Sequence, residues 1–180
     1  MQFTGEQIIF DKMRGNDIEL LQKTIERYNW ALPYCEDKIV ADLGCGTGLG
    51  AFILSLVAKE VKMVDWQIQA IEYSRQLTFF CQAEPYIINL ENEKPPFCEV
   101  AVAFDVIEHL NKPELMLTTL KAKLLLASIP LQAGTGEWHK INFTEDSARD
   151  LLKKTNWQII EETQQITKAG KKGLLLKCVR

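Results

Sequence analysis

The stretch that most constrains the fold is KIVADLGCGTGLG, from Lys38 to Gly50, in which a short apolar run leads into four glycines. The run from Lys38 to Leu43 predicts a buried strand, and the apolar residues from Leu49 to Ala58 predict a helix directly after the glycines. Glycines at this position let the chain turn sharply and bring backbone N–H groups close to a ligand at the helix start. The segment therefore predicts a βαβ unit whose first strand ends in a ligand-binding loop.

The pattern of the remaining chain extends this unit into a single α/β domain. With 180 residues, 47% of them hydrophobic, the chain can bury one core of ordinary size. Short apolar runs alternate with helical patterns, which predicts a mostly parallel sheet covered by helices on both faces. We expect a three-layer, doubly wound α/β fold of seven strands with an antiparallel hairpin at its C-terminal end. The further strands are expected at Val61–Asp65, Tyr86–Asn89, Val100–Phe104, Lys123–Ile129, Trp157–Ile166 and Gly173–Val179, and the further helices at Gln67–Phe80, Lys112–Lys121 and Glu145–Thr155.

Charge and cysteine content exclude several classes of protein. A formal net charge of −3 gives no general attraction to nucleic acid, and the one basic cluster, Lys168 to Lys172, is predicted to be a solvated turn. The five cysteines show neither metal-binding spacing nor a disulfide framework, which indicates a reducing compartment. Without a signal-peptide pattern or an apolar run long enough to span a bilayer, the chain is expected to be cytoplasmic.

Polar residues that follow different strands are expected to meet at one edge of the sheet. Because parallel strands all end at the same edge, the loop Gly44 to Gly48 converges there with Asp65, Asn89 and Asp105. A carboxylate at the position of Asp65 can accept hydrogen bonds from both hydroxyls of a ribose. Glycine loop and acid together predict a cofactor that contains adenosine. The loop alone also fits a nicotinamide-binding unit, with Gly46 to Ala51 as its G-x-G-x-x-A.

Four segments of the sequence distinguish between a nicotinamide cofactor and another cofactor that contains adenosine. VADLGCGTG, from Val40 to Gly48, resembles motif I of the class I S-adenosylmethionine-dependent methyltransferases, and VDWQIQAIEYSR, from Val64 to Arg75, resembles the family's ribose-binding acid and following helix. INLENEKPPF, from Ile88 to Phe97, is similar to the stretch that contacts adenine, although the family usually has Asp in place of Asn89. VAFDVIEHL, from Val102 to Leu110, is similar to the motif on the fourth strand.

The resemblance implies a sheet of strand order 3-2-1-4-5-7-6 and S-adenosyl-L-methionine as the cofactor. A nicotinamide-dependent oxidoreductase fits less well, because the chain has no second domain for a hydride-accepting substrate and that fold does not end in an antiparallel hairpin. Asp105 has two roles open to it, in the cofactor pocket or as a cap of local backbone groups. By the resemblance, the cofactor-binding residues are Gly44, Cys45, Gly46, Gly48, Asp65, Trp66, Asn89, Leu90 and Asp105.

Residues 1–37 precede the cofactor-binding domain, 38–180, within one structural domain. Asn16 is predicted to cap a helix that presents an apolar stripe formed by Ile18, Leu21, Ile25 and Tyr28. Thr4-Gly5-Glu6 resembles the leader of sugar- and glycan-associated methyltransferases. The segment is expected either to fold over the cofactor as a lid or simply to cover an edge of the sheet.

His139 is the candidate catalytic residue. It lies in WHKINFT, Trp138 to Thr144, which resembles a segment beside the acceptor pocket of small-molecule and sugar methyltransferases, and its imidazole could remove a hydroxyl proton. The alternative is a loop histidine bonded to backbone. Asp105, Glu108 and His109 resemble the E-x-x-E-H cation site of ubiquinone-pathway O-methyltransferases, but Glu-His-Leu more often has a structural use, so no metal is expected.

The resemblance therefore predicts transfer of a methyl group to an oxygen of a small molecule or sugar. The fourth strand runs into Phe104-DVI, so the chain lacks the [DN]-P-P-[FY] motif of the methyltransferases that act on amino groups of nucleic acid. No nucleic-acid or membrane partner is expected. A non-catalytic binding module with the same fold stays open as an alternative, because the cofactor motifs are distinctive and the acceptor region is not.

Overall fold

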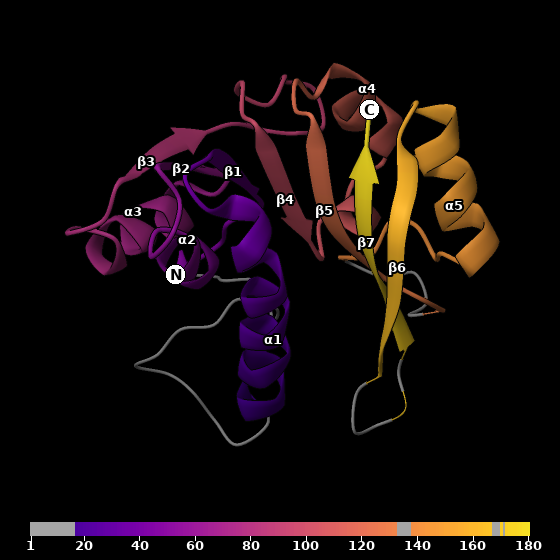
Figure 1. Cartoon of the computed structure of the whole chain (residues 1–180), viewed down its shortest axis with the longest axis horizontal. Helices are drawn as coiled ribbons and strands as arrows, with labels where there is room; N and C mark the ends of the chain where they lie inside the picture. Colours follow the sequence, from indigo (N-terminus) through magenta and orange to yellow (C-terminus); the bar gives the residue numbers. More distant parts are fainter. Residues whose placement is uncertain (1–16, 133–137, 167–169, 171) are drawn as a thin grey trace.

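The fold is built on a seven-stranded sheet (Figure 1). The structure is a computed structural model that describes residues 17–132, 138–166, 170 and 172–180. The strands follow the order β3-β2-β1-β4-β5-β7-β6, and β7 runs antiparallel to both of its neighbours. The predicted fold class and strand order are therefore confirmed. The strands are β1 (Ile39–Leu43), β2 (Glu60–Asp65), β3 (Ala83–Ile87), β4 (Val100–Phe104), β5 (Leu124–Pro130), β6 (Gln158–Ile166) and β7 (Lys172–Val179).

Helices cover both faces of the sheet and enclose two cores. One core packs α1 (Asp17–Cys35), α2 (Leu49–Leu54) and α3 (Ile68–Leu77) against side chains such as Val40 and Val102. The other packs α4 (Pro113–Thr119) and α5 (Glu145–Lys154) against Ala41, Ala101 and their neighbours. Successive residues of β1 and β4 thus point to opposite cores, as a strand buried on both faces requires.

Helix α1 belongs to the packed domain and also extends beyond the sheet. Its Tyr28, Ala31 and Cys35 are buried in the first core. Its earlier part runs past the strand ends toward the β6–β7 hairpin (Figure 1), where Arg27 Nε donates to Gln165 Oε1 at 2.7 Å. The predicted cap, Asn16, and the leader 4–6 lie outside the described residues.

The clearest differences from prediction lie at β3, at the end of α2 and directly after β4. β3 covers Ala83–Ile87 and not Tyr86–Asn89: it is an edge strand, where the missing N–H of Pro85 is tolerated. α2 ends at Leu54, because the next residues close tighter turns, with the N–H of Leu56 donating to the Ile53 carbonyl. A short 3₁₀ turn, η2 (Ile107–His109), follows β4 and was not predicted.

The C-terminal elements agree closely with prediction. α5 begins after Thr144, whose side chain accepts from the Ser147 N–H at 3.2 Å, as a helix cap does. The closing antiparallel hairpin is confirmed, while its turn, expected at 168–172, lies mostly outside the described residues. Within the residues described, no helix has the length and apolar character needed to cross a lipid bilayer.

Candidate functional site

A cavity of about 440 Å³ lies at the carboxyl ends of β1, β2 and β4. The strand order reverses between β1 and β4, and ligands of open α/β sheets bind at such a switch point. Its volume falls in the range of small-molecule sites. Its walls come from α1, the glycine loop, the end of β2, the segment after β3, the end of β4 with η2, and residues 138 and 140.

All but one of the residues predicted to bind the cofactor line this cavity: Gly44, Cys45, Gly46, Asp65, Trp66, Asn89, Leu90 and Asp105. Gly48 is the exception: the lack of a side chain at this position allows α2 and α3 to pack closely. Its φ is 90°, and a Cβ there would lie 2.5 Å from Ser74 Cβ on α3. Gly48 therefore allows α2 to start against α3 and does not face the cavity.

Asp65 connects the glycine loop to the start of α3. Its Oδ2 accepts from the Gly46 N–H at 2.9 Å, and its Oδ1 accepts from the Gln67 N–H at 2.8 Å. Burial raises the pKa of Asp65, and these backbone N–H groups offset part of the rise. Each carboxylate oxygen has capacity for a second hydrogen bond. The carboxylate can thus hold the loop and still accept from a ligand in the cavity.

Asp105 is held by cations from α1. Arg27 forms an ion pair with it, Lys23 Nζ lies 3.3 Å from its Oδ2, and Ser128 Oγ donates to its Oδ1 at 3.0 Å. Burial alone raises the pKa of Asp105, but the charges of Arg27 and Lys23 outweigh it, so the pKa lies below its ordinary value. Asp105 therefore both lines the cavity and fastens α1 over the end of β4.

Asn89 and Trp66 lie on the wall formed by the segments after β2 and β3. Asn89 Oδ1 accepts from the Glu91 N–H at 3.0 Å, so the side chain shapes its own turn two residues beyond β3. Trp66 is 61% exposed although it lines the cavity. An exposed indole at such a wall offers an apolar face on which a planar base can pack.

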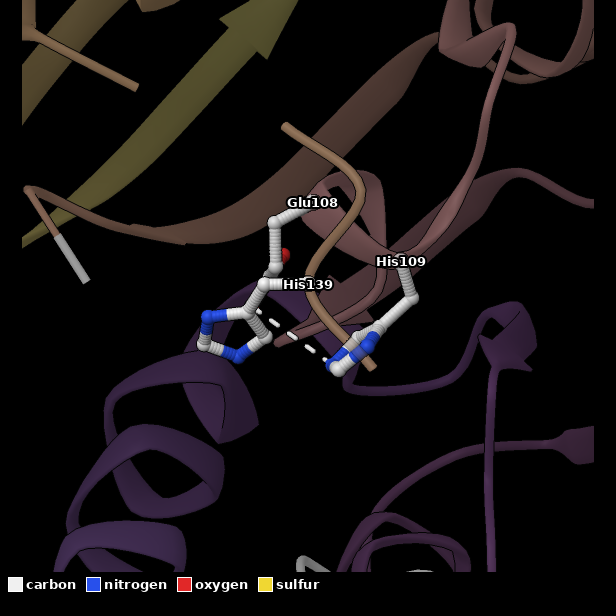
Figure 2. Close-up of side chains that lie close together, drawn as sticks. All are labelled: Glu108, His109 and His139. Carbon is white, nitrogen blue, oxygen red and sulfur yellow. Dashed lines mark ion pairs between the residues drawn. The ribbon is translucent and has the colours of Figure 1, made fainter. Parts of the chain in front are cut away.

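His139, the predicted general base, does not line the first cavity. It lines a second cavity of about 520 Å³, together with Glu108 and Asp105. His109 lines the first cavity, and its ring centroid is 4.9 Å from that of His139 (Figure 2). The two cavities therefore share Asp105, and the histidine pair stands between them.

Asp42 and Tyr28 form a buried polar pair beneath the glycine loop. The Tyr28 hydroxyl donates to Asp42 Oδ1 at 2.8 Å, and Asp42 has no exposed surface. Burial is the main cause that raises the pKa of Asp42 to about 7, against an ordinary value of 3.8. Asp42 therefore joins the end of β1 to α1 and does not line the cavity.

We expect Asp42→Asn to flatten the pH dependence of stability. Because the folded-state pKa of Asp42 is the higher one, its stabilising effect is complete below the unfolded-state pKa of 3.8 and is lost as pH rises through about 7. The full loss corresponds to about 4 kcal/mol. Asparagine cannot ionise but still accepts from Tyr28. Urea unfolding of both proteins at pH 5 and pH 8 measures the difference, and an equal change in stability between the two pH values would contradict the assignment.

Comparison with known proteins identifies the fold. No family model matches the chain. Over 85 residues it is 34% identical to a probable S-adenosylmethionine-dependent methyltransferase of Mycobacterium tuberculosis, found in two strains. That alignment covers 46% of this chain and 30% of the relative, so the chain spans less than a third of the curated proteins it matches.

Solved structures match nearly the whole chain. Magnesium protoporphyrin IX methyltransferase from Synechocystis PCC 6803 has a TM-score of 0.76 at 17% identity, covering 97% of this chain and 89% of its own. An N-methyltransferase from Bradyrhizobium japonicum WM9 has a TM-score of 0.74 at 15% identity, covering 93% and 99%. The chain has the fold of the class I methyltransferases. The 1,6-didemethyltoxoflavin-N1-methyltransferase of Burkholderia thailandensis agrees, with a TM-score of 0.75 at 15% identity over 92% of this chain and 82% of its own.

The first cavity is also lined by residues that the sequence analysis did not assign to it. Leu20, Thr24, Arg27 and Tyr28 reach it from α1, and His109 and Lys140 reach it from two loops. The apolar stripe of α1 predicted packing only. Arg27 is 3% exposed, and a buried arginine requires an anionic partner, but this burial is visible only in the structure.

Proposed function

We propose that the protein binds S-adenosyl-L-methionine in the first cavity and transfers its methyl group to a small molecule. The observation that carries this proposal is the Asp65 carboxylate, 7% exposed, at the cavity wall directly beside the glycine loop. The local sequence likeness to a probable S-adenosylmethionine-dependent methyltransferase supports it, as do neighbours of the same fold whose structures hold the donor or its product.

The proposed placement of the donor follows from the chemistry of the walls. Asp65 would accept from the ribose hydroxyls, and Trp66 would pack against the adenine. The loop Gly44 to Gly46 lines the cavity and would lie along the methionine part of the donor. Methyl transfer from a sulfonium needs alignment of donor and acceptor above all, which a preformed cavity supplies. Asn89 and Leu90 complete this wall.

We place the acceptor on the side of the second cavity. That cavity shares Asp105 with the first and is lined by polar side chains, among them Lys23, Gln132 and Lys172. Such a lining suits a small hydroxylated molecule, including a sugar, and we propose oxygen as the accepting atom. Two of the solved neighbours are named for different small molecules, magnesium protoporphyrin IX and 1,6-didemethyltoxoflavin. Imidazoles at this side could receive the hydroxyl proton.

Two measurements test the proposal in sequence. Calorimetry with S-adenosylhomocysteine and with NAD⁺ is expected to show binding of the first only. Incubation with S-adenosylmethionine and fractionated pools of hydroxylated metabolites is then expected to release S-adenosylhomocysteine, measured by mass spectrometry. Binding without turnover on any pool would favour a non-catalytic module of the same fold. Binding of NAD⁺ alone would overturn the cofactor assignment.

A further inference from the structure

The two histidines of the chain lie side by side, although they come from different loops. The sequence contains no histidine besides these two. His109 ends η2 after β4, and His139 lies in the segment between β5 and α5. Their rings meet edge to face with centroids 4.9 Å apart, and Glu108 lies beside both (Figure 2).

The backbone holds these two loops together. The N–H groups of Lys140 and Ile141 both donate to the Glu108 carbonyl, at 2.8 and 3.2 Å. These bonds fix the position of the His139 segment relative to η2 independently of the side chains. The grouping of Glu108, His109 and His139 is therefore built into the fold, on backbone that other contacts already order.

A further contact sets the orientation and tautomer of His109. Its Nδ1 lies 3.0 Å from the Trp138 carbonyl oxygen. A carbonyl can only accept, so Nδ1 carries the hydrogen, and in the neutral ring Nε2 then presents its lone pair. Nε2 lies 3.9 Å from Glu108 Oε1. A backbone carbonyl that fixes the far nitrogen of a histidine in this way is the usual support of a metal-binding imidazole.

The spacing of the three side chains fits a single ion. One ligand atom of each lies within 4.8 Å of the others, and Glu108 is 1% exposed. Two ligands that each lie about 2.1 Å from one ion are about 3–4 Å apart. Small side-chain rotations therefore suffice to bring the three atoms to one centre. Asp105 cannot join them, because Arg27 and Lys23 already engage its carboxylate.

We propose that Glu108, His109 and His139 bind a divalent transition-metal ion of the zinc class. Two imidazole nitrogens and one carboxylate oxygen are ligands for zinc and related ions, whereas magnesium and calcium prefer oxygen alone. Three protein ligands leave a coordination position open, as in catalytic zinc sites. The site differs from the Asp105, Glu108 and His109 set considered from sequence, because its third ligand comes from a distant loop.

The position of the site suggests what the open coordination position would hold. His109 lines the first cavity, and Glu108 and His139 line the second. An ion between them would bind a hydroxyl oxygen of the acceptor and lower its pKa. This role rests on the proposed function, while the existence of the site does not. With the ion bound, His139 is a ligand and not a free base.

The test uses the full chain, free of any affinity tag, without cofactor or acceptor. Calorimetry with zinc sulfate is expected to show one site, and magnesium chloride to show none at the same concentrations. Histidine-ring NMR is expected to show both imidazoles shifting together, which is unambiguous because the chain has two histidines. Tight magnesium binding, or zinc binding that leaves either ring unmoved, would overturn the proposal.

Matched variants separate ligation from folding. His139→Gln and His109→Gln are each expected to weaken zinc binding by more than about 100-fold, because even outer-shell changes cost about 10–100-fold. Cys81→Ser, which removes a partly exposed thiol, is expected to leave it unchanged. Zinc should raise the unfolding temperature of the parent chain but not of folded His139→Gln. Equal zinc affinity in parent and His139→Gln would refute the site, whatever the outcome with S-adenosylhomocysteine.

Discussion

Asp65→Ala is expected to weaken the binding of S-adenosylhomocysteine by at least about 100-fold, since hydrogen bonds to a charged group contribute about 1.5 kcal/mol or more each. The carboxylate is the group we assign to the ribose, and it also accepts from the Gly46 N–H at 2.9 Å. Removal of the side chain therefore deletes a ligand contact and releases the glycine loop. Calorimetry at constant pH and salt measures the loss.

A ligand analogue separates these two effects of the substitution. The 2′-deoxy analogue of S-adenosylhomocysteine lacks one hydroxyl that Asp65 would accept from. The parent chain should bind this analogue more weakly than the full ligand, and Asp65→Ala should bind both equally. A preference for the full ligand that survives in Asp65→Ala would show that another residue holds the ribose.

Glu60→Ala is the matched control for this experiment. Glu60 begins the same strand, β2, that Asp65 ends, and its carboxylate is partly exposed beside Lys62 at 3.6 Å. The control removes a carboxylate at the amino end of β2, whereas the cavity lies at the carboxyl end of this strand. Ligand affinity should therefore not change. Equal losses in Glu60→Ala and Asp65→Ala would point to general damage to β2 and not to a ribose contact.

The parts of the fold set by local chemistry could be predicted from the sequence. β1 and β4 are mostly or fully apolar runs, so both strands could be placed from their own residues. The edge that carries the site followed from the common direction of parallel strands. The strand order came from the resemblance. β3 was misplaced because Pro85 argues against a strand unless the strand lies at an edge. Edge position is a property of the whole sheet and is not visible in a single segment.

The candidate site was predictable where one loop and one strand end define it, and not where distant segments meet. Asp65 and the glycine loop are neighbours through β1 and β2, so their meeting follows from parallel pairing. The ion pair of Arg27 with Asp105 and the contact of His109 with His139 each join separate elements. No local pattern encodes these distances, which depend on how α1 and the loop after β5 pack.

Gly50→Ala is expected to lower the free energy of unfolding by about 3 kcal/mol, at the upper end of the usual cost of overpacking. Gly50 lies in α2, where a Cβ would stand 1.9 Å from Cζ and 2.2 Å from Oη of Tyr28. The ring cannot simply turn aside, because its hydroxyl donates to Asp42 at 2.8 Å and the ring packs edge to face with Phe104 at 5.1 Å between centroids. Helix α1 would have to move away from α2.

The sign of this effect decides between two physical accounts. Helix propensity alone predicts that alanine stabilises α2 by about 1 kcal/mol relative to glycine, whereas the contact with Tyr28 predicts the opposite. Gly170→Ala serves as the control, because its φ is 77° but no atom of the residues that the structure describes lies within 4 Å of the added Cβ, so only backbone strain applies. In the background of Tyr28→Ala the ring is absent, and Gly50→Ala should then cost little or stabilise. A stabilising Gly50→Ala in the parent chain, measured by urea unfolding, would show that α1 does not pack on the start of α2.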